Sequence, residues 1–176
     1  KDYYKIIDNL FLLGVKQIGI TGGEPLTHPY FTEIINYIYN LGIKIYLSTN
    51  CDYYFNFEQL INEKISILGI PIDGSTSEIH DFHRGKGSFS NVMNVMNNII
   101  SSNNNLLLKI GTVVTNYNFK NLNLIEELLN NYNDKILFWK LYELIIYEKN
   151  KNALQMKSDD FILQKDFGSY IESSKI

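Results

Sequence analysis

The chain alternates between strand-like and helix-like segments over almost its whole length. Short runs rich in Ile, Leu, Val and Phe predict strands, and between them apolar residues recur every three or four positions, as in helices. The predicted strands cover residues 16–21, 44–49, 67–72, 106–115 and 135–147, and the predicted helices cover residues 3–13, 30–41, 57–65, 89–100 and 122–132. Such alternation predicts an α/β fold with a parallel sheet, either an open doubly wound sheet or a barrel.

The length of 176 residues suits one domain, so we expect a core over residues 1–150 and a C-terminal extension over residues 151–176. The 16 basic and 19 acidic residues give a net charge of -3, which argues against nucleic acid as a partner. No apolar run is long enough to span a bilayer, and no signal peptide is visible. We therefore expect a soluble, cytoplasmic protein.

The first predicted strand ends in a short motif with the features of a ligand site. Gly22 and Gly23 lack side chains that would keep a ligand from the backbone, and the carboxylate of Glu24 follows directly. Pro25 fixes its own φ and biases Glu24 toward an extended conformation. The motif suits an ammonium group, although an ordinary turn after a strand would have similar residues.

Further motifs follow predicted strands at the same edge of the sheet, where ligands bind in both candidate architectures. Ser48, Thr49 and Asn50 end the second strand, and Asp73 and Gly74 end the third. The sequence HDFHRGKGSF follows over residues 80–89, and FWKLYE occupies residues 138–143 of the last strand. In this order, these motifs and GGEP resemble those of the radical SAM superfamily, whose members cleave S-adenosylmethionine (SAM) to begin radical chemistry. The resemblance extends to about residue 149.

The resemblance implies a partial (β/α)6 TIM-like barrel of the radical SAM type, with the first strand missing from this chain. It also implies a set of SAM-binding residues: Gly22, Gly23, Glu24, Pro25, Ser48, Thr49, Asn50, Asp73, Arg84 and Asn116. In this set Glu24 and the two glycines hold the SAM ammonium group, and Arg84 pairs with a carboxylate of SAM or the substrate. The alternative for Arg84 is a surface ion pair, and for residues 48–50 a polar turn. Pro71 stands where many relatives place a serine.

The resemblance also implies a 4Fe–4S cluster, which these enzymes hold by three cysteines spaced CxxxCxxC. Cys51 is the only cysteine, so we expect the cluster ligands to lie outside this chain and no metal site within it. We expect Cys51 to be an ordinary free thiol and this chain alone to be inactive. His80 and His83, placed on a predicted loop, lack a third convergent ligand, which favours structural or capping roles.

Four residues near the ends of the last two predicted strands are candidate substrate contacts: Lys109, Asn118, Lys140 and Glu143. Lys109 interrupts an apolar strand, so it either extends into solvent or points into the cavity toward an anion. The HDFHRGKGSF motif favours a peptide or small-molecule substrate, with an electron donor as partner. The last two strands favour nucleotide dehydration, as in viperin-like members, which would require Lys109, Lys140 and Arg84 to converge. A non-catalytic barrel that binds a peptide or a partner is the remaining alternative.

Overall fold

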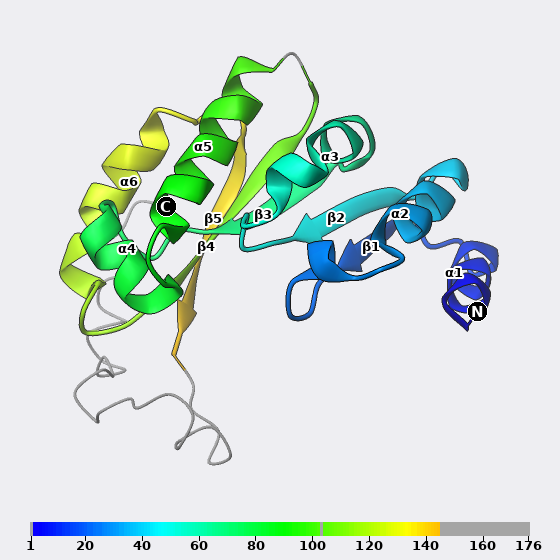
Figure 1. The fold of residues 1–176 in the computed structure, drawn as a ribbon, viewed down its shortest axis with the longest axis horizontal. Helices are drawn as coiled ribbons and strands as arrows, with labels where there is room; N and C mark the ends of the chain where they lie inside the picture. Colours follow the sequence, from blue (N-terminus) through cyan, green and yellow to red (C-terminus); the bar gives the residue numbers. More distant parts are fainter. Residues whose placement is uncertain (1, 103, 145–176) are drawn as a thin grey trace.

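The computed structural model describes residues 2–102 and 104–144 and contains one sheet of five parallel strands (Figure 1). The strands are β1 (Gln17–Ile20), β2 (Lys44–Ser48), β3 (Ile67–Pro71), β4 (Leu107–Val114) and β5 (Ile136–Glu143). Each lies within the range predicted from the sequence. Residues 145–147 of the last predicted strand and the predicted extension over residues 151–176 lie outside the described residues.

The strands follow one another across the sheet in chain order, from β1 to β5, and every neighbouring pair is parallel. The chain moves from strand to strand in one direction across the sheet, and crossovers between parallel strands are right-handed. The helices that connect the strands therefore all lie on the same face. A doubly wound sheet reverses its strand order and carries helices on both faces. The sequential order therefore selects the partial barrel over the doubly wound sheet, and the strong twist of the sheet is visible in Figure 1.

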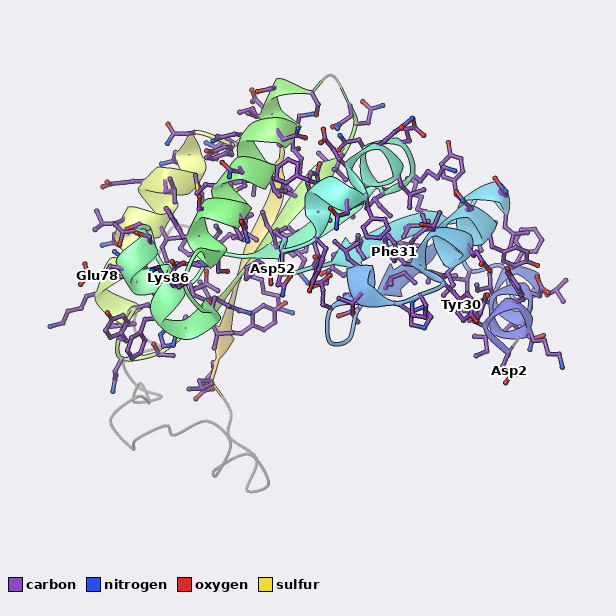
Figure 2. The ribbon with its side chains drawn as sticks, viewed as in Figure 1. Asp2, Tyr30, Phe31, Asp52, Glu78 and Lys86 are labelled. Atoms are coloured by element: carbon purple, nitrogen blue, oxygen red, sulfur yellow. The ribbon has the colours of Figure 1, made fainter. Side chains whose placement is uncertain are left out.

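The helices are α1 (Asp2–Leu12), α2 (Phe31–Asn40), α3 (Glu58–Lys64), α4 (Ser77–Arg84), α5 (Ser88–Ser101) and α6 (Leu122–Asn130). Single 3-10 turns occur at Pro25–Thr27, Tyr54–Asn56 and Phe119–Asn121. Figure 2 shows Asp2 and Tyr30 at the end of the molecule that carries α1, and Glu78 and Lys86 at the opposite end, beside α4. No helix within residues 2–102 and 104–144 is long and apolar enough to cross a membrane.

Helix α4 corrects the loop predicted between the third strand and the helix over residues 89–100. His80 is the one residue of α4 that is buried, and among its eight residues only Ile79 and Phe82 are apolar, which is too few for the sequence to predict a helix. The Asp81 carboxylate accepts hydrogen bonds from the backbone N–H groups of Gly87 and Phe89, at 2.7 and 2.8 Å. These bonds stabilise the start of α5 and lower the pKa of Asp81.

The two faces of the sheet differ in what covers them. Along β4, buried residues such as Ile110 alternate with half-buried ones such as Lys109, because successive side chains point to opposite faces. The buried set packs with Val95 of α5 and Ile125 of α6 in a continuous core. We call the face of the sheet that carries Ile110 and packs against these helices the helix face. The opposite face, which carries Lys109, is the open face.

Candidate functional site

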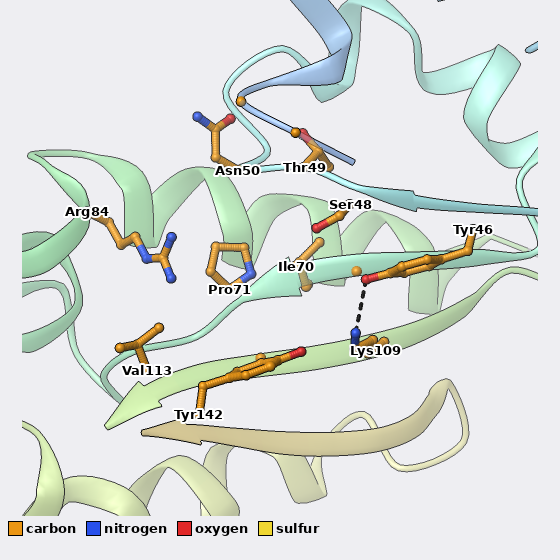
Figure 3. A pocket seen from close by; sticks show the side chains of 14 residues that line it. Tyr46, Ser48, Thr49, Asn50, Ile70, Pro71, Arg84, Lys109, Val113 and Tyr142 are labelled. Carbon is orange, nitrogen blue, oxygen red and sulfur yellow. Dashed lines mark hydrogen bonds between the residues drawn. The ribbon is translucent and has the colours of Figure 1, made fainter. Parts of the chain in front are cut away.

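A cavity of about 380 Å³ lies on the open face, toward the C-terminal ends of the strands (Figure 3). This volume falls within the roughly 300–1,000 Å³ usual for small-molecule sites. The lining residues are Gly22, Gly23, Tyr46, Ser48, Thr49, Asn50, Gly69, Ile70, Pro71, Arg84, Lys109, Gly111, Val113 and Tyr142. Seven of the predicted site residues are among them, and they come from four different segments of the chain.

Gly22 and Gly23 line the cavity with bare backbone, as predicted. Gly22 has φ +146°, a conformation that favours glycine. A Cβ atom built on either glycine would meet no atom within 4 Å, so space for a ligand lies directly against this backbone. The site therefore fits a group that is recognised by main-chain atoms, such as the ammonium group of SAM.

Glu24 is half-buried, and its carboxylate joins the turn after β1 to the end of β2. Its Oε1 accepts hydrogen bonds from Leu26 N at 3.1 Å and Thr49 Oγ1 at 2.8 Å, and its Oε2 accepts one from Asn50 N at 2.8 Å. Pro25 opens the 3-10 turn for which Glu24 is the N-cap. The sequence predicted direct contact between Glu24 and the ligand, whereas the geometry makes Glu24 a clamp between two loops that line the cavity.

Asp73 and Arg84 form an ion pair at the edge of the cavity. The Asp73 side chain is 2% exposed, and its Oδ2 lies 2.5 Å from Arg84 Nε. Its Oδ1 accepts a hydrogen bond from Val113 N at 2.8 Å. Asp73 does not itself line the cavity, whereas Arg84 does. Since only Nε of the guanidinium group is bonded to Asp73, the two terminal nitrogens can still donate to a carboxylate or phosphate.

A buried network beneath Asp73 explains the role of His80. Its Nδ1 accepts a hydrogen bond from Asp73 N at 3.1 Å, and its Nε2 lies 3.2 Å from Ser88 Oγ. Burial, more than the nearby Arg84, lowers the pKa of His80. The prediction of a structural role for His80 is confirmed, and among the described residues no cluster of His, Cys, Asp and Glu could hold a metal ion.

Two predicted site residues at the end of β4 lie away from the cavity lining. Asn118 is fully buried, and its Nδ2 donates to the carbonyl oxygens of Asp73 and Val113, each at 2.9 Å. This structural role replaces the predicted substrate contact, because the side chain faces the protein interior. Asn116 is exposed in the turn after β4 and is not a lining residue.

Lys140 and Glu143 lie on opposite faces of β5. Lys140 pairs in register with Gly111 and shares the open face, where its Nζ lies 5.0 Å from the Tyr142 ring centroid. Glu143 pairs with Val114, whose side chain belongs to the helix face. The prediction that both residues project toward the substrate is therefore wrong for Glu143, because alternate residues of a strand point in opposite directions.

Tyr46 and Tyr142 are cavity residues that the sequence analysis missed. Lys109, which was predicted, lies between them, and its Nζ donates to Tyr46 Oη at 3.2 Å. Burial acts to lower the pKa of Lys109, but hydrogen bonding to the two tyrosines holds it above its ordinary value. Both tyrosines could have been identified from the alternation of side chains along a strand, because residues two positions apart point to the same face. Tyr46 lies two residues before Ser48, and Tyr142 lies two residues after Lys140.

Cys51 is buried and adopts φ +74°, which is uncommon for a residue other than glycine. Burial, with a smaller contribution from the nearby Glu24, raises the pKa of its thiol. A buried neutral thiol is a poor nucleophile and a poor metal ligand, which agrees with the predicted free thiol. The thiolate ligands of an iron–sulfur cluster are therefore not supplied by this residue.

Comparisons with known proteins agree with this geometry. The model of the radical SAM superfamily matches residues 1–129. An S-adenosylmethionine-dependent nucleotide dehydratase of Selenomonas ruminantium is 30% identical over an alignment of 184 positions, gaps included, which covers 95% of this chain and 62% of that protein. Mycofactocin maturase MftC of Mycobacterium ulcerans is 33% identical over 132 residues, which cover 72% of this chain and 35% of MftC.

A solved structure shares the fold. Streptococcus suis SuiB bound to the precursor peptide SuiA has a TM-score of 0.73 at 14% identity, with 97% of this chain and 38% of that chain covered. The chain thus spans less than two thirds of each of these three proteins. The family match, the partial barrel and the cavity at its strand ends lead to one conclusion: the chain belongs to the radical SAM superfamily.

Proposed function

We propose that this chain forms the SAM-binding part of a radical SAM enzyme that abstracts a hydrogen atom from an anionic small molecule or a peptide. One observation carries the proposal. The bare backbone of Gly22 and Gly23, the polar end of β2 and the Arg84 guanidinium group all face a single cavity. Bound SAM supplies the 5′-deoxyadenosyl group that becomes the hydrogen-abstracting radical in this superfamily.

The residues of this chain bind and orient SAM. Gly22 and Gly23 offer main-chain atoms to its ammonium group, and Glu24 keeps that turn joined to Thr49. Ser48, Thr49 and Asn50 line the wall beside them, within reach of a sugar or carboxylate. Arg84, held by Asp73, pairs with the carboxylate of SAM.

The cluster of the superfamily requires thiolate ligands that this chain does not contain, since its one cysteine is buried. We infer that these 176 residues alone bind SAM without cleaving it. Iron reconstitution followed by a test for 5′-deoxyadenosine checks this inference. Cluster absorption together with SAM cleavage by this chain would contradict it.

The placement of the cations supports a nucleotide as the substrate class. Lys109 and Arg84 line the same cavity, and Lys140 lies on the same face of the sheet. Two of the three cations that the nucleotide alternative requires therefore line one cavity, and a triphosphate carries several negative charges that they could bind. The relative from Selenomonas ruminantium is named as a nucleotide dehydratase, which agrees with this choice.

A peptide is the second candidate substrate. The structural neighbour SuiB is bound to a precursor peptide, and the cavity of this chain lies on the open face of the sheet. Binding measurements with nucleoside triphosphates and with short peptides, each in the presence of SAM, separate the two candidates. Binding of the triphosphate with loss of affinity in Lys109→Met supports the nucleotide.

The test of SAM binding uses isothermal titration with the wild type and with Arg84→Met. We expect the variant to bind SAM at least tenfold more weakly, because a charged hydrogen bond contributes about 1.5–3 kcal/mol. Lys86→Met is the matched control, since Lys86 is exposed and does not line the cavity. Absence of SAM binding by the wild type would refute the proposed function.

A further inference from the structure

Two tyrosines on the open face lie against glycines of neighbouring strands. A Cβ atom built on Gly69 would lie 2.9 Å from Tyr46 Cε2, and one built on Gly111 would lie 3.2 Å from Tyr142 Cε2. Real Cβ atoms essentially never approach another heavy atom within 3.0 Å, so a larger residue at position 69 would displace the Tyr46 ring. Gly69 therefore gives Tyr46 the space to lie across the sheet.

Lys109 extends between these two rings along the open face, as Figure 3 shows. Its Nζ lies 3.2 Å from Tyr46 Oη, 5.0 Å from the Tyr46 ring centroid and 6.0 Å from the Tyr142 ring centroid. Aromatic faces attract ammonium groups without neutralising their charge. The two tyrosines therefore position a cation that keeps its capacity to bind an anion.

The part of the cavity that Tyr46 and Lys109 line, which we call its floor, presents hydrogen-bond donors and positive charge. The Lys109 ammonium group has three donors, so that with one directed to Tyr46 and one toward Tyr142 a donor is left for a ligand. Tyr46 Oη accepts that bond, so its own hydrogen is left to donate to a ligand. Lys109 and Arg84 are the charged residues of the described lining, which contains no Asp or Glu. Because Asp73 pairs with Arg84, Lys109 supplies the unbalanced positive charge of the lining, which suits an oxyanion in a chain of net charge -3.

We propose that Tyr46 is a specificity-determining residue, which positions the Lys109 ammonium group and donates its hydroxyl hydrogen to the same oxyanion of the substrate. Gly69 preserves the space that the Tyr46 ring needs. This inference rests on the proposed function, in which the substrate enters this cavity beside SAM. The oxyanion is a phosphate of a nucleotide or a carboxylate of a peptide, and both are hydrogen-bond acceptors of the kind that this floor fits.

The first test compares wild type with Tyr46→Phe, which keeps the ring over Gly69 and removes only the hydroxyl group. Binding of a nucleoside triphosphate and of a glutamate-containing peptide is measured by titration with SAM present. We expect Tyr46→Phe to bind the preferred oxyanion about tenfold more weakly or worse, because hydrogen bonds to charged groups have this magnitude. SAM affinity should not change. The matched control is Tyr53→Phe, since Tyr53 is exposed and outside the cavity lining.

The second test examines Gly69→Ala. We expect this variant to lose oxyanion affinity and to unfold at a lower temperature, because the added methyl group displaces the Tyr46 ring. In a Tyr46→Ala background, Gly69→Ala should lower the unfolding temperature less than it does in the wild type, since the methyl group then has room, and neither variant should regain oxyanion affinity. This pattern separates the loss of packing from the loss of binding.

The outcomes distinguish this inference from the proposed function. If wild type binds neither SAM nor an oxyanion, the proposed function itself fails. If wild type binds SAM but neither the triphosphate nor the peptide, or if Tyr46→Phe binds the oxyanion as wild type does, the role of Tyr46 is refuted and SAM binding stands.

Discussion

The ion pair between Asp73 and Arg84 provides a quantitative test of how the cavity is built. We consider Asp73→Asn, which preserves the size of the side chain and an oxygen acceptor for Val113 N but removes the charge that faces Arg84. A hydrogen bond between charged groups contributes about 1.5–3 kcal/mol, and breaking a fully buried pair costs about 3–5 kcal/mol. The Arg84 side chain is 33% exposed and can turn toward water. We therefore expect Asp73→Asn to lower the free energy of unfolding by about 2–3 kcal/mol.

A double-mutant cycle isolates the interaction between the two side chains. Wild type, Asp73→Asn, Arg84→Met and the double variant are unfolded in urea, and the free energies of unfolding are compared. We expect a coupling energy of about 1–2 kcal/mol, within the range measured for residues in contact. The same Asp73→Asn variant should bind SAM more weakly, since its Arg84 is no longer held at the cavity.

Two results would refute this reasoning. A coupling energy below about 0.5 kcal/mol, which is the usual error of additivity, would mean that the pair contributes no specific interaction. Unchanged SAM affinity in Asp73→Asn would mean that the orientation of Arg84 does not depend on Asp73.

Three further predictions concern the clamp, the packing and the pH dependence. Glu24→Gln should weaken SAM binding about fivefold or more in titrations, because the amide loses one of the acceptors for Thr49 and Asn50; an unchanged dissociation constant would contradict the clamp. Gly74→Ala should destabilise the protein by about 1–3 kcal/mol in urea unfolding, because its Cβ would lie 2.5 Å from His80 N; wild-type stability would show that this contact relaxes freely. Since the pKa of His80 is held below its ordinary value of 6.5, the unfolded chain takes up a proton that the native state does not, and the free energy of unfolding should fall as pH drops below about 6.5. His80→Asn should flatten this slope in urea unfolding at pH 5 to 7, and an unchanged slope would assign it to another group.

Much of the fold could be predicted because buried strands in a parallel sheet are short, apolar and bounded by glycine or polar residues. The run that ends at Pro71 and the run that contains Ile110 satisfy this pattern, and both form central strands. Helix α4 was missed because it is short and mostly polar, and its one buried residue, His80, is held by polar contacts that a search for apolar residues does not detect. The choice between barrel and doubly wound sheet depends on strand order, which local patterns do not encode.

The site residues that directly follow a strand could be predicted, because the C-terminal ends of parallel strands meet at the edge of the sheet where ligands bind. Gly22, Ser48 and Thr49 face the cavity for this reason. The direction of a single side chain was harder to predict, since Asn118 lies only five residues after Val113, which lines the cavity, and yet points into the protein. Tyr46 resembled an ordinary core residue because aromatic residues are common in strands. Its role depends on Gly69, which is distant in sequence and adjacent in space.

Cys51 gives the protein an internal reporter of local opening. It is the only cysteine of the chain, and it is 1% exposed directly after the turn that Glu24 holds. A thiol reagent can modify it only when that turn opens and exposes the sulfur atom, because both burial and the raised pKa suppress reaction in the closed state. The rate of labelling therefore measures how often this wall of the cavity detaches, and a ligand that binds the closed wall slows the reaction in proportion to its occupancy.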